Sequence, residues 1–403
     1  MKILMFASWY PDKEKIGRGI FFKEQAEMLS EMGHEISVIV AERKPFTYLL
    51  KMKDIYKSIF CKHSSIEVEN GITVYRSNKY KLFPLKIFPA LIIPFLIYDS
   101  KRMFNRYLAK NGKPDIIHAQ SAIHGGFIAS RITDKYQIPL VITEHRSNYF
   151  NKKIPLIYKI ETIICSKKVY KYIFVSESLK QAVKNMVGKN NHFKNVVIGN
   201  YVHDIFFNVP IKESNTNVFV FCTVGNLIKI KDHKSLIISF FLAFKNIKNV
   251  HLLIVGEGKE RQSLEKLIFE LKIKDKVTFL GYKTRIELVE ILSLSNSFVF
   301  SSKNETFGLA LAEATAVGLP VISTNCGGPS GIISNKNGYL VPVGDRDLFA
   351  KKMFELYINY KKFNRLEIRK ECQKKYGRLS IGTQIENVYK ECLGINIPKE
   401  GEV

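Results

Sequence analysis

One stretch constrains the fold of this chain more than any other. It consists of an apolar segment, a polar loop, a small helix and a second apolar segment. Residues 298–300 read Phe-Val-Phe, which is too short for a helix but typical of a strand buried on both faces. A run of helix formers covers 309–314, and Gly318 and Pro320 end that helix. The apolar residues 321–323 predict a second strand, so the order indicates a parallel sheet and an α/β fold.

The loop and the start of this helix predict an anion site. In a parallel sheet the helix N-terminus faces the crevice outside the strand ends. The backbone amides of Phe307, Gly308 and Leu309 can donate to a phosphate there, and Gly308 lets it come close. Glu305 precedes the phosphate position, and Glu313 lies about one turn into the helix, where a carboxylate can accept two hydroxyl hydrogen bonds from a ribose. By spacing alone, a solvated loop glutamate and a surface helix glutamate would also fit.

The full string resembles the signature of the family 4 retaining glycosyltransferases, which have the GT-B fold. Two glutamates are separated by seven residues, Phe-Gly follows the first, and the second opens Glu-Ala-x-Ala-x-Gly-x-Pro-Val-Ile. The resemblance implies two Rossmann-like domains with parallel sheets facing an inter-domain cleft. It also implies that Glu313 binds ribose and that Glu305 contacts the sugar hydroxyls as a catalytic residue. In that family no covalent nucleophile is needed, because the leaving phosphate helps to deprotonate the acceptor on the same face.

The length of 403 residues predicts two domains of ordinary size. Strands and helices alternate in both halves, and the polar residues 208–217, which contain Pro210, are typical of a linker. We expect an N-terminal, acceptor-binding domain over 1–200 and a C-terminal, nucleotide-sugar-binding domain over 201–379. The last helix, about 380–397, is expected to join the first domain, as GT-B chains usually do.

The chain is strongly basic, with 62 lysine and arginine residues against 37 aspartate and glutamate residues and a formal net charge of +25. This balance indicates an anionic partner, which could be nucleic acid, an anionic membrane surface or phosphorylated substrates. Frequent Lys, Asn and Ile can also reflect an AT-rich coding sequence. Because the basic residues are spread along the chain with no recognition motif, we expect no nucleic acid partner.

Six cysteines show no paired spacing and no Cys-x-x-Cys, which predicts buried thiols in a reducing compartment. The N-terminal apolar run 3–7 is too short for the core of a signal peptide, and it predicts a first strand. No apolar segment of the sequence is long enough to span a bilayer as a helix. We therefore expect a cytoplasmic protein that is peripheral on the inner face of the cell membrane.

Residues 82–113 leave two interpretations open. The segment 82–98 is apolar but broken by three prolines, and basic residues follow it up to Lys113. An apolar segment bordered by basic residues suits a protein lying on an anionic leaflet. A core helix with a solvated basic face fits equally well.

In the first half, two candidate residues lie at strand ends. The resembled family has small residues facing the donor diphosphate in its first loop, and Gly19 matches that place better than Gly17. The alternative is a glycine needed only for the turn of the loop itself. A strand over 140–143 leads to Thr-Glu-His, which resembles the family's Thr-x-His segment. The resemblance implies that His145 contacts the donor sugar or the reacting centre. The alternative for His145 is a structural histidine with satisfied hydrogen bonds.

Two further histidines are weaker candidates. His124 precedes Gly125-Gly126 and is a candidate for acceptor binding. His118 is expected to pack behind the strand edge that carries His145.

In the second half, the first loop departs from the resembled family, which has Gly-Arg-Leu and then Lys-Gly there. The family's Arg and Lys neutralise the donor diphosphate. Lys231 matches the Lys, but Asn226 stands in place of the Arg and Asp232 in place of the following Gly. A departing diphosphate needs positive charge, and Lys229 could supply it only if its side chain points inward. One expected cation of the donor site is therefore missing.

The next strand ends at a Gly-Glu-Gly turn that begins with Gly256. Arg261 occupies the place of the third glycine of a dinucleotide fingerprint, which argues against NAD. The resembled family has a similar turn near the nucleotide.

These features predict a metal-independent, retaining glycosyltransferase of the hexosyltransferase type. Its donor is a nucleotide diphosphate sugar, with UDP preferred from its frequency in the family. Its acceptor is a saccharide or a polyprenyl-diphosphate-linked saccharide of surface polysaccharide synthesis, such as capsule, O-antigen of lipopolysaccharide, or exopolysaccharide. No metal and no cofactor are expected, since the nucleotide sugar is a substrate. A GT-B nucleotide-sugar epimerase and a basic nucleic-acid-binding protein are the alternatives.

Overall fold

The computed structural model describes residues 1–12, 17–43, 64–77, 89–151, 153–188, 191–211 and 217–396. The chain divides into two compact units. Unit 1 comprises Met1–Val175, Leu179–Ile198 and Gly382–Val403, and unit 2 comprises Ser176–Ser178 and Gly199–Ile381. The predicted α/β class with two parallel sheets is confirmed by these units.

Unit 2 contains a sheet of six parallel strands in the order β11-β10-β9-β12-β13-β14. The strands are β9 (Phe219–Val224), β10 (Val250–Val255), β11 (Val277–Gly281), β12 (Ser297–Phe300), β13 (Val321–Thr324) and β14 (Gly338–Val341). The strand order reverses direction between β9 and β12. In open parallel sheets, ligands bind outside the carboxyl ends of the strands at such a switch point.

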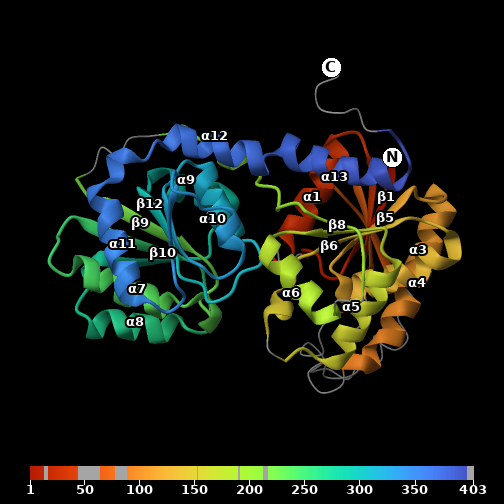
Figure 1. Ribbon diagram of the computed structural model, residues 1–403, viewed down its shortest axis with the longest axis horizontal. Helices are drawn as coiled ribbons and strands as arrows, with labels where there is room; N and C mark the ends of the chain where they lie inside the picture. The colour runs from red at the N-terminus through yellow and green to blue at the C-terminus, as the bar shows by residue number, and fades with distance from the viewer. Residues whose placement is uncertain are drawn as a thin grey trace. The chain divides into compact units, whose positions relative to one another are not determined.

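Three helices cover one face of the unit 2 sheet (Figure 1). They are α7 (His233–Phe244), α8 (Arg261–Glu270) and α11 (Arg346–Ile358). Their apolar residues form one core with the inward side chains of the strands, among them Phe221, Phe240 and Phe244. Burial of each such side chain contributes about 1.5–3 kcal/mol, so this core fixes the strand ends that carry the site loops. The remaining helices of unit 2 include α9 (Arg285–Leu294), α10 (Leu309–Ala316) and α12 (Arg365–Tyr376).

Unit 1 contains an eight-stranded sheet in the order β3-β4-β2-β1-β5-β6-β7-β8. The strands are β1 (Lys2–Ala7), β2 (Glu35–Val40), β3 (Ser64–Glu69), β4 (Ile72–Ser77), β5 (Ile116–Gln120), β6 (Leu140–Glu144), β7 (Lys171–Phe174) and β8 (Asn195–Val197). All neighbours are parallel except β3, which forms an edge hairpin with β4. The turn residues Asn70 and Gly71 have positive φ values of 48° and 81°, as a two-residue hairpin loop requires. The switch point of this sheet lies between β1 and β5.

The helices of unit 1 are α1 (Ile20–Glu31), α3 (Ile93–Asn111), α4 (Phe127–Tyr136), α5 (Leu156–Lys168) and α6 (Glu177–Val187). The part of α13 (Arg378–Cys392) from Gly382 onward also belongs to this unit. Its Tyr389 hydroxyl lies 2.6 Å from Nδ1 of His118, whose Nε2 lies 2.7 Å from the Thr143 hydroxyl. His118 is fully buried and has a partner on both nitrogens, so it is a structural residue.

Helix α3 answers part of the question about 82–113. Residues 82–88 lie outside the described residues, but one face of α3 is buried in unit 1, including Leu96 and Phe104. A buried ion pair also holds it, with Arg43 Nε donating to Asp99 Oδ2 at 2.6 Å. Residues 93–111 therefore form a helix with one face in the core, and the membrane interpretation concerns its exposed face. Among the described residues, no helix combines the length and the apolar character needed to cross a membrane.

The described cysteines are all free thiols. Four of them, Cys165, Cys222, Cys326 and Cys372, are buried. Cys61 lies outside the described residues.

Candidate functional site

The candidate site of unit 2 is built where two loops meet at the switch point between β9 and β12. The hydroxyl of Ser301 donates to the carbonyl of Lys231 at 3.0 Å, and the amide of Lys303 donates to the carbonyl of Ile230 at 2.8 Å. These bonds hold the 229–232 turn against the loop that follows β12. Two segments about 70 residues apart in the chain are thereby brought together.

Within this site, Lys231 forms an ion pair with Glu305. The sequence analysis assigned Lys231 to the diphosphate and Glu305 to the sugar. Their side chains are 22% and 18% exposed, so water competes for both charges. Ion pairs at such positions contribute about 0–1 kcal/mol, which a bound anion can outweigh.

The backbone around Glu305 is rigid although its side chain can exchange partners. The amide of Glu305 donates to Cys326 at 3.0 Å, and the amide of Gly328 donates to Glu305 at 2.8 Å. A Cβ atom at Gly328 would overlap the backbone of Phe307, so this crossing requires glycine. The loop geometry is therefore set by backbone bonds on both sides.

Helix α10 begins after Gly308, whose φ of 95° is in the left-handed region. The amides of Phe307, Gly308 and Leu309 have no hydrogen-bond acceptor within the described chain, as is usual in the first turn of a helix. The Phe307 ring packs against Tyr376 with ring centroids 5.2 Å apart, so only the backbone of Phe307 is available for a ligand. This geometry is compatible with a phosphate, whose binding here stays a prediction.

Glu313 lies one turn further along α10 and is 6% exposed. Burial raises the pKa of its carboxyl group, while the Arg285 guanidinium, whose Nη1 lies 3.0 Å from Glu313 Oε1, acts in the opposite direction. The Arg285 guanidinium also stacks 5.5 Å from the centre of the Phe206 ring. Glu313 is thus a buried acceptor that a cation holds in place.

The remaining predicted residues of unit 2 lie around the β9 turn. The amide of Gly256 donates to Gly281 at 2.8 Å, and a Cβ atom at Gly256 would overlap the carbonyl of Gly225. Gly256 is therefore needed for close packing of the turns after β9 and β10. Asn226 and Lys229 are both exposed, so the Lys229 side chain does not point inward.

In unit 1, His145 and Gly19 share one aromatic cluster. The ring of His145 packs against both Phe21 and Phe22, with centroid distances of 5.0 and 4.9 Å, and these two rings also contact each other. Gly19 has a φ of 79°, and a Cβ atom there would lie 2.8 Å from Cδ1 of Trp9 and 3.4 Å from Phe22. The structure therefore brings these two predicted residues to the same place.

The hydrogen bonds of His145 define its tautomer. Gln120 donates through Nε2 to Gln25 at 2.7 Å, so its Oε1 accepts from Nε2 of His145 at 2.9 Å. Nδ1 of His145 then carries a lone pair, and this buried atom has no partner within the described chain. Burial, and secondarily His118, lowers the pKa of His145 to about 3, so the ring is neutral near pH 7. A neutral imidazole with a free lone pair can accept a hydrogen bond from a hydroxyl group.

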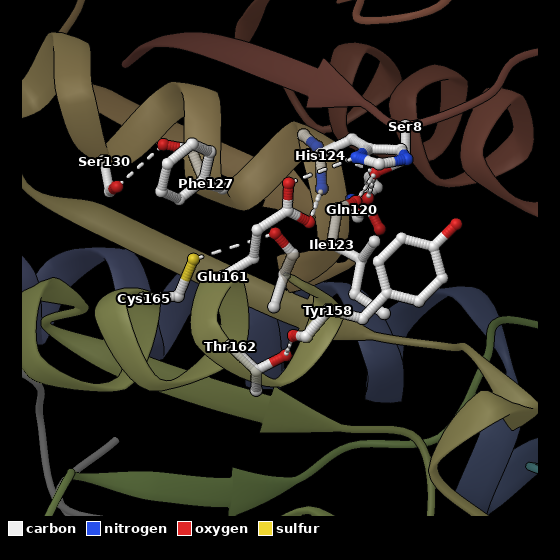
Figure 2. Close-up of polar contacts among 12 residues, drawn as sticks. Ser8, Gln120, Ile123, His124, Phe127, Ser130, Tyr158, Glu161, Thr162 and Cys165 are labelled. Atoms are coloured by element: carbon white, nitrogen blue, oxygen red, sulfur yellow. Dashed lines mark hydrogen bonds and ion pairs between the residues drawn. The ribbon is translucent and has the colours of Figure 1, made fainter. Parts of the chain in front are cut away.

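His124 lies in a strained turn at the switch point of unit 1. Its φ and ψ of 66° and −72° are rare for a residue with a side chain. The fully buried carboxylate of Glu161 accepts from the amide of His124 at 3.1 Å and faces its Nδ1 at 3.3 Å (Figure 2). The hydroxyl of Ser8 donates to the carbonyl of Ile123 at 2.8 Å and accepts from the amide of Gly125 at 3.1 Å. These bonds keep His124 in its unusual conformation.

A second buried carboxylate, Glu144, supports the same region. It accepts from the amides of Ala122 and His145 at 2.9 Å each, and from the amide of Arg146 at 3.0 Å. The hydroxyl of Tyr149 donates to it at 3.1 Å. Glu144 therefore links the turn that carries His124 to the strand end that carries His145.

Several of these residues were missed by the sequence interpretation. Arg285 had a local signal, because a cation in the first turn of a helix opposes the helix dipole. The start of this helix is marked by Thr284 and Glu287, which cap it with reciprocal hydrogen bonds. Glu161 and Gln120 had none, since their partners are distant in the chain. The described residues contain no group of three or more His, Cys, Asp and Glu side chains that could hold a metal ion.

Comparison with protein families gives two matches that follow each other along the chain. The model for "Glycosyltransferase Family 4" matches residues 17–203, and the model for "Glycosyl transferases group 1" matches residues 204–374. Together they cover most of the chain.

Individual proteins with similar sequences carry out glycosyl transfer. N-acetyl-alpha-D-glucosaminyl L-malate synthase of Bacillus anthracis is 25% identical over 98% of this chain and 98% of its own. The Escherichia coli UDP-Gal:alpha-D-GlcNAc-diphosphoundecaprenol alpha-1,3-galactosyltransferase is 28% identical over 64% of this chain and 70% of its own. Among solved structures, Anabaena HepE in complex with UDP and glucose has a TM-score of 0.71 at 16% identity, over 97% of this chain and 100% of that one. At this identity the structural likeness shows the fold, which is of the GT-B type.

Proposed function

Since this chain belongs to the group 1 and family 4 glycosyltransferases of the GT-B type, we propose that it transfers a hexosyl group from a UDP-sugar with retention of configuration and without a metal. The acceptor is a saccharide linked to a polyprenyl diphosphate, in the synthesis of a capsule, an O-antigen or another surface polysaccharide. The enzyme works at the inner face of the cell membrane.

One observation carries the donor part of this proposal. The Lys231–Glu305 pair and the free amides before α10 lie together at the switch point of unit 2, and Glu313 lies one turn further along α10. A cation and helix amides suit a diphosphate, a partly exposed carboxylate suits sugar hydroxyls, and a buried carboxylate suits a ribose. The order of these groups along the loop follows the order of the parts of a nucleotide sugar.

The proposed reaction uses these groups at the departing diphosphate. The bond between the anomeric carbon and the diphosphate oxygen breaks, and its electron pair stays on that oxygen. Lys231 and the amides of Phe307–Leu309 stabilise the charge that develops there. The acceptor hydroxyl attacks on the same face, and its proton passes to the leaving phosphate. His145, neutral and with a free Nδ1, accepts a hydrogen bond from a sugar hydroxyl.

The acceptor part rests on relatives and on charge. The Escherichia coli relative is named for a diphosphoundecaprenol-linked substrate, and the chain has a net charge of +25. Leu91, in the 3-10 turn before α3, and Phe95 and Tyr98 of α3 are 48%, 37% and 61% exposed. They follow one another at helical spacing. Exposed Lys101 and the half-buried Arg102 continue this stripe. We propose that this apolar and basic stripe contacts an anionic membrane.

A nucleotide-binding experiment tests the donor site first. Thermal stability is measured with UDP, GDP and dTDP, with and without magnesium, for the wild type, Glu313→Ala and the exposed control Glu290→Ala. A metal-independent rise with UDP that Glu313→Ala loses and Glu290→Ala keeps is expected. No rise with any of the three nucleotides would refute the proposal. Incubation with UDP-sugar alone tests the epimerase alternative, which requires an altered nucleotide sugar without any acceptor.

A liposome experiment tests the membrane contact. The wild type should sediment with anionic phosphatidylglycerol vesicles at low salt but not with neutral vesicles. Leu91→Ser combined with Tyr98→Ser should reduce the bound fraction several-fold. Phe269→Ser, which removes a 74% exposed side chain from α8 of unit 2, should leave it unchanged. A wild type that stays in the supernatant with anionic vesicles would contradict the contact.

A further inference from the structure

His233, the first residue of α7, is a buried imidazole that the donor site described so far does not use. It follows Lys231 and Asp232 directly and is 4% exposed. Its Nδ1 is buried and has no hydrogen-bond partner within the described chain. A buried polar atom without a partner destabilises the folded chain, so its retention at a ligand site requires an explanation.

The ring borders the space next to the glycine of the β9 turn. A Cβ atom added at Gly225 would lie 3.9 Å from Cε1 of His233 and 3.9 Å from Cγ and Cδ of Lys231, with nothing closer. The imidazole edge and the stem of Lys231 therefore form two walls around this glycine. The next residue is Asn226, which stands where the resembled family has an arginine.

Burial, together with the charge of Lys231, keeps the ring of His233 neutral as long as no anion is bound. Burial, and then the positive charge of Lys231, lowers the pKa of His233 to about 4, while Asp232 acts in the opposite direction. Asp232 is itself bound by the Ser235 hydroxyl at 2.9 Å and by Lys303 at 3.4 Å. Glu305 of the loop after β12 forms its ion pair with Lys231. An anion placed over Gly225 would favour the protonated ring, because an opposite charge at short range stabilises the charged form.

We propose that His233 is a diphosphate-binding residue of this chain, which takes up a proton from solvent as the nucleotide diphosphate binds and so supplies the positive charge that Asn226 cannot. This inference rests on the proposed function, since it concerns the same donor site. It explains how the site can hold two phosphate charges although, of the two cations in the resembled family, Lys231 is the one that this chain keeps.

The proposal makes nucleotide affinity depend on pH with a defined sign. The ring is neutral in the free protein above pH 4 and protonated in the complex, so binding consumes a proton. Between the two pKa values, the Kd of UDP then rises with pH, by at most tenfold per unit. The terminal phosphate of UDP itself titrates near pH 6 and acts in the opposite direction. The effect of His233 is therefore measured as a difference between the wild type and a variant.

Isothermal titration calorimetry of UDP against the full chain tests this prediction. Titrations at pH 6.5 in two buffers of different ionisation enthalpy give the number of protons taken up. The proteins compared are the wild type, His233→Asn, the volume-conserving His233→Phe, and the control His251→Asn, which changes a histidine of β10. Uridine serves as the ligand without a diphosphate.

The wild type and His251→Asn should take up more protons with UDP than either His233 variant. From pH 6 to pH 8 their Kd should weaken about 3-fold or more relative to that of the His233 variants. Uridine should show no difference between the proteins. The role of His233 would be overturned if the wild type and the folded His233 variants took up equal numbers of protons. If UDP binding still required Glu313 in that case, the proposed function would stand. Absence of UDP and GDP binding in the wild type would overturn the proposed function together with it.

Discussion

In unit 2 the carboxylates of the candidate site are bound to cations, whereas in unit 1 they are bound mainly to backbone amides. Glu305 pairs with Lys231, and Glu313 pairs with Arg285. Glu161 accepts from the amide and faces the ring of His124, and Glu144 accepts from three amides and a tyrosine hydroxyl. Both unit 1 carboxylates are completely buried.

This difference separates side chains that can exchange partners from side chains that hold the chain in shape. A ligand hydroxyl or phosphate can replace one member of the partly exposed Lys231–Glu305 pair at little cost. The buried Glu313 carboxylate has further lone pairs beside the one that Arg285 occupies. A buried carboxylate that accepts several amide hydrogen bonds cannot be released without exposing those amides. We therefore expect substitutions of the unit 2 carboxylates to act on nucleotide binding and those of the unit 1 carboxylates to act on stability.

The largest effect is expected for Glu313→Ala. If two ribose hydroxyls donate to this carboxylate, their loss costs about 3 kcal/mol or more, since each hydrogen bond to a charged group contributes about 1.5–3 kcal/mol. The Kd of UDP measured by calorimetry should rise at least about 100-fold. Glu290→Ala of α9 should bind UDP like the wild type. UDP binding by Glu313→Ala within about 3-fold of the wild type would contradict the ribose role of Glu313 and the functional difference between the carboxylates of the two units.

The second effect is expected for Glu161→Ala in unit 1. The substitution leaves the amide and Nδ1 of His124 without their acceptor in a strained turn, and the cost should be about 2–3 kcal/mol of the free energy of unfolding. Scanning calorimetry should show unfolding of this variant at a lower temperature than that of the wild type. UDP affinity should stay within about 2-fold, because Glu161 belongs to unit 1.

The exposed Glu35→Ala, at the first residue of β2, is the matched control for Glu161→Ala and should unfold like the wild type. An unchanged unfolding transition in Glu161→Ala would mean that the carboxylate does not support the turn. A loss of UDP binding at unchanged stability would assign Glu161 to the nucleotide instead.

The parts of the site that the sequence could predict lie mostly within one contiguous stretch. The strand, loop and helix of residues 297–316 follow local rules, so their boundaries and the placement of Glu305 beside the α10 N-terminus could be predicted from a contiguous stretch. The Lys231–Glu305 pair joins residues 74 apart, and the sequence assigned both residues to one site only through the family resemblance.

The parts that could not be predicted depend on distant contacts. Glu161 and His124 are 37 residues apart, and no periodic pattern marks a glutamate that is buried to bind a backbone amide. The β3–β4 hairpin, in contrast, carried a local signal that the sequence interpretation overlooked. Asn70-Gly71 is the residue pair that two-residue hairpin loops favour.

The smallest effect is expected for Glu305→Gln, which alters the partly exposed ion pair of unit 2. The neutral amide releases the Lys231 ammonium to the diphosphate, so the Kd of UDP should fall about 2- to 5-fold, in line with the contribution of about 1 kcal/mol or less for such a pair. Sugar transfer should nevertheless decrease, because the carboxylate that contacts the sugar hydroxyls is lost.

Lys231→Met should weaken the binding of UDP but not that of uridine. Lys229→Met, which alters an exposed lysine of the same turn, should change the binding of neither ligand. Weaker UDP binding by Glu305→Gln would mean that the carboxylate supports the diphosphate site rather than competing for its cation, and unit 2 would then resemble unit 1.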